Sequence, residues 1–163
     1  MTPRRLLSGW TVILILFNLW WLSGFQYAWE IAKRTGEEER VRFMMGAILP
    51  LQLEGGFVLI GLLLALILWR KRPKVALAIS MLTLAIPVLL FALLFAHGVT
   101  VLKILPPGTL DPSLDLETFS AILRPALLAY YGIPIVNLLL VLACFSEIVY
   151  MREESALQRN MRS

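Results

Sequence analysis

One acidic side chain lies inside an apolar stretch that could cross a membrane, and it is the clearest candidate for chemistry in this sequence. Glu54 stands 16 residues before Arg70. A helix rises 1.5 Å per residue, so the carboxylate is about 24 Å from that basic end. The hydrocarbon layer of a bilayer is about 30 Å thick, and ionisable groups within it face protein or a cavity and mark functional sites. Glu54 is therefore predicted to belong to a polar site inside the membrane.

Three further residues are expected to contribute to this polar site. Arg124 lies near the start of the last apolar segment, and its long side chain can reach inward to the depth of Glu54. His97 stands 23 residues after Lys74, about 34 Å along a helix, close to the membrane surface opposite the basic cluster. The predicted site lies in the outer leaflet. It either binds a ligand, a quinone or a lipid headgroup, or acts as a structural clamp between the second and fourth segments. Its members are Glu54, Arg124, His97 and Gln52.

The sequence contains no recognisable catalytic machinery. One histidine, His97, and one cysteine, Cys144, cannot form a zinc site with the usual spacing. The chain has no glycine-rich phosphate loop, no nucleophile elbow and no Cys-x-x-Cys pair. No catalytic residue is predicted, and His97 is the only candidate ligand for a metal, haem or chlorophyll. We find no motif that assigns the chain to a known family, and no particular cofactor is predicted.

The composition identifies an integral membrane protein. Of the 163 residues, 59% are hydrophobic and 16% are charged, with a mean hydropathy of +0.78. Too few polar residues remain to cover a soluble globule of this size. The net charge of +4 arises from basic residues beside apolar segment ends, where they determine membrane topology, so nucleic acid is not an expected partner. We predict one transmembrane domain over residues 1–163.

Four apolar segments are predicted to form an all-α, antiparallel transmembrane bundle, because backbone groups in lipid must be satisfied within helices. Kinks are expected near Pro87 and Pro134, and Gly36 suits the residue just past the end of the first helix. Two pairs of small residues with four-residue spacing, Ala76/Ser80 and Ala92/Ala96, are typical of close helix contacts. The predicted helices are residues 8–30, 42–70, 74–104 and 119–151.

The distribution of basic residues predicts the orientation. With four spans, the N-terminus, the turn at residues 70–74 and the C-terminal tail share one side and carry nine Lys and Arg residues, against six on the other side. Four of the nine lie in a tight turn, where the positive-inside rule is strongest. We therefore expect both termini in the cytoplasm of a bacterial-type inner (plasma) membrane.

Three functions are consistent with these patterns. The first is a non-catalytic subunit or assembly partner of a larger membrane complex, because the segments leave little room for a soluble domain and Asn18, Asn137 and Glu54 exceed the polar needs of a small bundle. The second is a redox subunit that binds a quinone, haem or chlorophyll. The third is a small oligomeric ion- or proton-coupled transporter that uses Glu54. The expected partners are lipid and either other membrane subunits or further copies of the chain.

Overall fold

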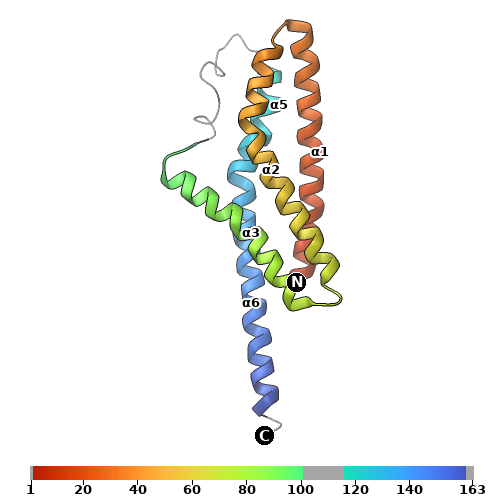
Figure 1. The fold of residues 1–163 in the computed structure, drawn as a ribbon, viewed down its shortest axis with the longest axis vertical. Helices are drawn as coiled ribbons and strands as arrows, with labels where there is room; N and C mark the ends of the chain where they lie inside the picture. The colour runs from red at the N-terminus through yellow and green to blue at the C-terminus, as the bar shows by residue number, and fades with distance from the viewer. Residues whose placement is uncertain (1, 101–115, 161–163) are drawn as a thin grey trace.

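The computed structural model describes residues 2–100 and 116–160, and every regular element within these ranges is a helix. Four helical stretches are long and apolar enough to cross a membrane. The chain runs up α1, down α2, up α3 and down through α5, η1 and α6 (Figure 1). The all-α, four-helix antiparallel transmembrane bundle is confirmed. Its elements are α1 Pro3–Thr35, α2 Glu38–Leu68, α3 Pro73–Ala96, α5 Leu116–Leu127, η1 Leu128–Gly132 and α6 Ile133–Asn160.

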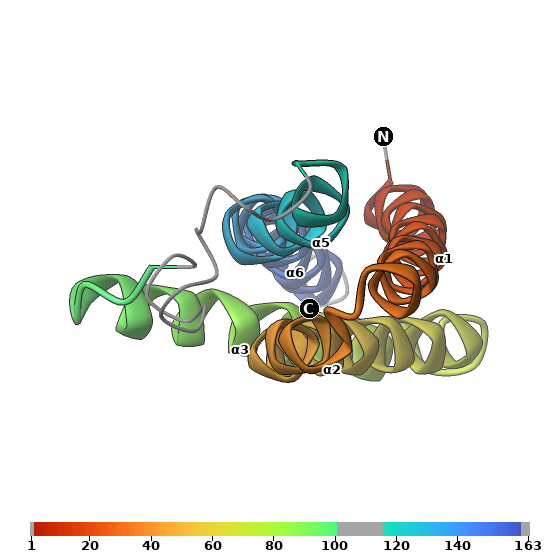
Figure 2. The ribbon, with the colours of Figure 1, turned by 90° about the horizontal axis from the view of Figure 1, so that it is seen from above.

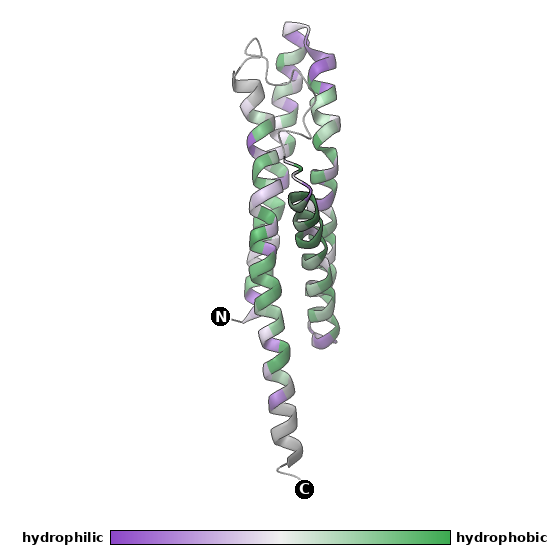
Figure 3. Cartoon of the chain, turned by 90° about the vertical axis from the view of Figure 1, so that its left-hand side faces the viewer, coloured by the Kyte–Doolittle hydropathy of each residue, from purple (hydrophilic) through white to green (hydrophobic). Residues whose placement is uncertain are grey.

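The outer surface of the bundle is apolar over most of its length. Figure 3 shows hydrophobic residues along the helices and hydrophilic residues gathered at the α1–α2 connection. Large side chains such as Leu16, Ile60 and Ile67 are more than half exposed and point away from the core. A water-soluble monomer rarely exposes such a continuous apolar surface, whereas lipid tails accept it. The protein is therefore an integral membrane protein in contact with lipid.

The α1–α2 connection forms where the sequence predicted it. Gly36 adopts φ 76° and ψ 19°, a left-handed conformation that glycine takes without steric cost, and its N–H donates to the carbonyl of Ala32. Lys33 and Arg34 occupy the last turn of α1, and α2 begins at Glu38. Both helices extend past their predicted limits of 8–30 and 42–70 at this end. Their charged tips suit the water beyond the lipid.

The third helix ends earlier than predicted. The sequence suggested a helix to residue 104, but α3 stops at Ala96. Gly98 adopts φ 65°, its N–H donates to Phe95 O, and the N–H of Val99 donates to Leu94 O. This pair of bonds is a Schellman motif, which terminates the helix. The prediction from hydropathy extended the helix too far because Val99 and Thr100 are compatible with a span. Gly98 is the stop signal.

The fourth span is broken into two α-helices by a single π-turn, η1. The N–H of Ile133 donates to Leu128 O, five residues earlier, which is the π pattern. The turn ends two residues before Pro134, whose ring and missing N–H disturb a regular α-helix. A kink near Pro134 was predicted, and the structure places a local widening of the helix there. The span starts at Leu116 and its helix continues to Asn160, beyond the predicted limits of 119–151. Asp111 followed by Pro112 predicts the start of a short interfacial helix, and this segment lies outside the described residues.

The four spans pack unevenly because α3 leaves the bundle. Viewed along the bundle, α1 and the far end of α3 lie on opposite sides, with α2, α5 and α6 between them (Figure 2). The first half of α3 contributes to the buried core, whereas the second half is only partly covered. Its buried residues are Ala76, Leu77, Ser80, Thr83, Leu84 and Pro87, and none follows Pro87 in the described part of the helix.

Candidate functional site

Glu54 lines a hollow between α2, α3 and the η1–α6 junction. The hollow measures about 210 Å³, including the space at its mouth, and its interior admits only a water-sized occupant. Glu54 is the one acidic residue in a wall that is otherwise apolar or aromatic. The hollow is lined by Leu51, Glu54, Phe91, Leu94, Ala129, Tyr130 and Pro134.

The backbone around Glu54 is held close to α1. A Cβ added to Gly55 would lie 3.9 Å from Nδ2 of Asn18, which shows that the two helices contact each other directly beside the carboxylate. Asn18 donates through the same nitrogen to Leu14 O at 2.8 Å, within its own helix. One face of α2 therefore packs closely on α1, while Glu54 lies on a different face of α2, toward α3 and η1.

The Glu54 carboxylate has no hydrogen-bond or ion-pair partner among the described residues. Within residues 2–100 and 116–160 the ion pairs join Lys33 to Glu30 and Arg40 to Glu37, both between neighbours at the α1–α2 end. No lysine, arginine or histidine lines the hollow. Ionised groups inside a membrane are normally paired or neutralised, so the unpaired carboxylate is the feature that needs an explanation.

An aromatic cluster forms the wall opposite Glu54. Tyr130 lies edge-on to Phe91, with ring centroids 5.4 Å apart, and to Tyr131 at 4.8 Å. The Tyr130 hydroxyl donates to Val99 O at 2.5 Å, which ties η1 to the chain just beyond α3. The π-turn brings Ala129 and Tyr130 to this position. The sequence predicted a kink near Pro134, but it gave no reason to connect this proline or the tyrosine pair with Glu54.

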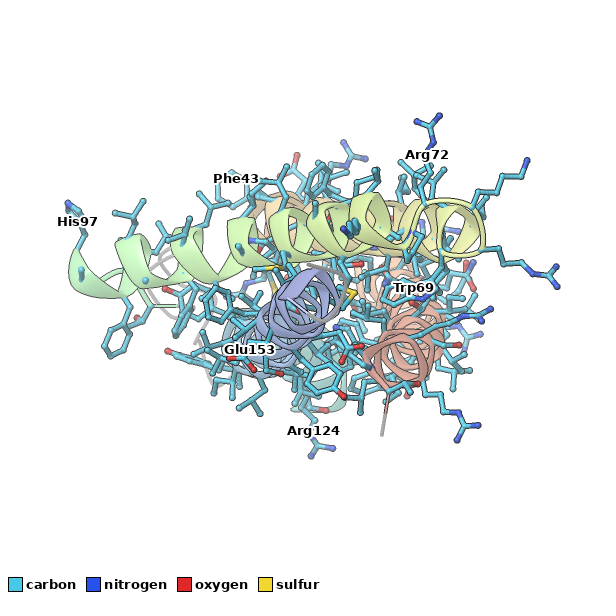
Figure 4. The ribbon with its side chains drawn as sticks, turned by 90° about the horizontal axis from the view of Figure 1, so that it is seen from below. Phe43, Trp69, Arg72, His97, Arg124 and Glu153 are labelled. Atoms are coloured by element: carbon cyan, nitrogen blue, oxygen red, sulfur yellow. The ribbon has the colours of Figure 1, made fainter. Side chains whose placement is uncertain are left out.

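The structure does not gather the other predicted site residues around Glu54. Arg124 is exposed on α5, and His97 is exposed beyond the end of α3; both point away from the bundle, on different sides of it (Figure 4). The Nδ1 atom of His97 lies 2.8 Å from Leu93 O, one turn earlier. Gln52 is half-buried but does not line the hollow, since residues two apart on a helix face different directions.

A second polar contact, which the sequence did not predict, joins α1 to α6. Trp10 donates through Nε1 to Oδ1 of Asn137 at 2.9 Å, and the Asn137 side chain is fully buried. The amide nitrogen of Asn137 has no partner in the described part of the chain. Asparagine within a span often bonds a neighbouring helix, and here the partner is a tryptophan. This contact clamps two helices and is separate from the hollow.

No group of three or more His, Cys, Asp and Glu side chains that could hold a metal occurs among the described residues. Cys144 is buried in α6 as a free thiol. Comparisons of the chain with protein-family models, curated proteins and solved structures find no match. The arrangement that remains is one membrane carboxylate in a small hollow beside a π-turn.

Proposed function

We propose that this protein is a non-catalytic subunit or assembly partner of a larger membrane complex. The carrying observation is the second half of α3, which separates from the bundle with no buried residue after Pro87. Helix association in lipid comes from van der Waals packing and interhelical hydrogen bonds. In this stretch Phe91 packs on Tyr130 and Tyr131, but much of the remaining surface is left uncovered by the described residues, including Leu89, Leu90 and Leu93. A helix supplied by another subunit or another copy would complete the packing.

The polar groups give this proposal narrower support than the sequence suggested. Asn137 accepts a hydrogen bond from Trp10 through its oxygen, and Asn18 donates to a carbonyl of its own helix, so each side chain makes at least one hydrogen bond inside the chain. Of Asn18, Asn137 and Glu54, only Glu54 makes no side-chain hydrogen bond or ion pair among the described residues. The splayed helix, rather than the number of polar residues, is therefore the argument for an assembly. His97 lies apart from the Glu54 hollow, so these positions do not favour a redox subunit over a structural one.

We place both termini in the cytoplasm of a bacterial-type inner membrane. The N-terminal end of α1, the α2–α3 turn and the carboxyl end of α6 point toward one end of the bundle (Figure 1). That end carries the cluster Arg70, Lys71, Arg72 and Lys74, which the positive-inside rule assigns to the cytoplasm.

Labelling of single cysteines tests this orientation. In a Cys144→Ser background, Arg72→Cys should be protected in intact cells from a membrane-impermeant maleimide, while Thr35→Cys should react. Both positions are exposed, and they flank opposite ends of α2. Inverted membrane vesicles should show the reverse pattern. Reaction of both cysteines from the same side would contradict the topology, and a reversed pattern in cells would overturn the cytoplasmic placement.

The assembly itself is tested by extraction in a mild detergent followed by native mass measurement. The expected particle exceeds the 18.4 kDa monomer and contains either a second protein or several copies of this chain. A monomer without a copurifying chain, found in every mild detergent tried, would refute the proposal.

Cysteine cross-linking locates the contact. In the Cys144→Ser background, Leu93→Cys on the outer half of α3 should form a cross-link to a partner in native membranes. Leu16→Cys on α1 is the matched control, because Leu93 is 59% exposed and Leu16 is 60% exposed. Equal cross-linking at both positions would show that α3 is not the preferred interface.

A further inference from the structure

The residues that line the hollow beside Glu54 carry oxygen atoms suited to a cation. The Glu54 carboxylate offers two oxygens and one negative charge. The Tyr130 hydroxyl donates its hydrogen to Val99 O, so the lone pairs of its own oxygen stay available. Carboxylate, hydroxyl and carbonyl oxygens are the ligands of hard cations such as alkali ions. The wall therefore combines one charge with neutral oxygen donors.

Pro134 removes one backbone N–H donor at the π-turn beside the hollow. Proline has no N–H, so Pro134 cannot donate to Tyr130 O in an α pattern or to Ala129 O in a π pattern. Ala129, Tyr130 and Pro134 all line the hollow. In membrane proteins, carbonyls freed where a helix is interrupted serve as ligands for small cations. Irregular backbone at membrane depth is tolerated where it lines a cavity.

The residues around the Glu54 carboxylate limit the size and the charge of a group that could bind in the hollow. The enclosed part of the hollow fits a water-sized group, and its open mouth lets a lipid-soluble reagent approach Glu54. Tyr130 is the only other titratable residue in the wall, and Tyr131 packs edge-on against it. Among the neighbouring helices, α3 contributes Phe91 and Leu94, and α1 contributes the neutral Asn18. One carboxylate balances one positive charge.

We propose that the hollow is a site for a single monovalent cation, held by the Glu54 carboxylate with neutral oxygens of the η1–α6 junction. The occupant is either a proton carried on the carboxylate or an alkali metal ion beside it. Either occupant neutralises a charge that no described side chain pairs. This inference is independent of the proposed assembly, because every residue it uses belongs to this chain.

Carbodiimide labelling of the full-length protein in lipid nanodiscs tests the site. A lipid-soluble carbodiimide modifies carboxyl groups in their protonated form, and peptide mass spectrometry identifies the modified residue. We expect modification of Glu54 whose rate falls about tenfold per pH unit above its midpoint, as for one titrating proton. No modification at any pH, or a rate that is the same at every pH, would overturn the proposal. Glu54→Gln should remove the modification, and Glu147→Gln, on α6, should leave it intact.

Salt dependence distinguishes the two occupants. Sodium, lithium or potassium chloride at constant ionic strength should slow labelling several-fold relative to choline chloride if an alkali ion binds. Labelling that depends on pH but not on the cation identifies the proton. In the alkali case, Pro134→Ala should abolish the protection because alanine supplies an N–H to the carbonyl. Pro125→Ala, in the same span but outside the hollow, should keep the protection.

A change in the volume of the hollow provides a test that leaves the carboxylate untouched. Ala129→Leu places a larger side chain in the wall and should slow the labelling of Glu54 several-fold. Ala92→Leu adds the same atoms at an exposed position on α3 and should have no effect. Equal labelling of both variants and the unmodified protein would show that the hollow is not the route or the site. Thermal unfolding of each variant confirms that the bundle is intact.

Discussion

Replacement of Trp21 by alanine should lower the free energy of unfolding by about 3 kcal/mol, near the lower end of the range for buried aromatic residues. Trp21 is 1% exposed and is the largest fully buried side chain in the described core. It packs against Phe17 and Phe25, with ring centroids 5.5 Å and 5.8 Å away. An unfolded membrane helix still lies in lipid, so the loss comes from the cavity and missing dispersion contacts rather than from transfer to water. Thermal unfolding in detergent measures it.

The neighbouring tryptophan provides the control. Trp20 is 46% exposed on the outside of α1, so Trp20→Ala should cost far less. The free energy of unfolding of Trp21→Phe should stay within about 1 kcal/mol of that of the unmodified protein. The Trp21 indole N–H has no hydrogen-bond partner in the described structure, so the benefit of removing this unpaired donor offsets part of the cost of the lost volume. If Trp20→Ala and Trp21→Ala destabilised the protein equally, the packing of Trp21 with Phe17 and Phe25 would not be central to the core.

The features predicted correctly from the sequence depend on local or compositional signals. Four apolar runs of sufficient length specify four spans, because lipid admits helices whatever their neighbours are. The α1–α2 connection follows from Gly36, since few other residues adopt its backbone conformation without strain. These properties of the chain do not depend on which helices pack together.

The path of α3 depends on tertiary packing, which hydropathy does not encode. The pairs Ala76/Ser80 and Ala92/Ala96 have identical spacing, yet Ala76 and Ser80 are buried while Ala92 and Ala96 are exposed. The same pattern therefore indicates a contact in one half of the helix and none in the other. The position of Gly98 was a local stop signal that was available in the sequence and was not used.

The sequence identified the charged residue of the candidate site, Glu54, but not the residues that surround it. Glu54 stood out because a carboxylate within an apolar run is costly. Arg124 and His97 were grouped with it by depth along the helices, but depth leaves the direction around each helix undetermined. The side chains that actually face Glu54 come from Phe91, Leu94 and the π-turn, and they carry no charge by which they could have been recognised.

A close approach of α2 and α3 gives the second large expected effect. Gly61 on α2 lies against Thr83 on α3, and a Cβ added at Gly61 would overlap the Thr83 side chain atoms Cγ2 and Oγ1. Thr83 is buried and cannot turn away freely. We expect Gly61→Ala to destabilise the bundle by about 1–3 kcal/mol through overpacking. Gly61→Leu should prevent native packing of α2 on α3 altogether. Thermal unfolding of both variants in the same detergent measures the effect.

Gly56 on α2 is the matched control, because nothing lies within 4 Å of a Cβ added there. Gly56→Ala should be neutral or stabilise α2 slightly, since alanine favours a helix over glycine. Thr83→Ala should recover part of the stability lost in Gly61→Ala, because it removes both overlapping atoms while the Thr83 Cβ remains 3.0 Å from the new Cβ. A double-mutant cycle isolates this coupling. If the two glycine variants unfolded at the same temperature, or if Thr83→Ala gave no recovery, α2 and α3 would not meet at Gly61 and Thr83.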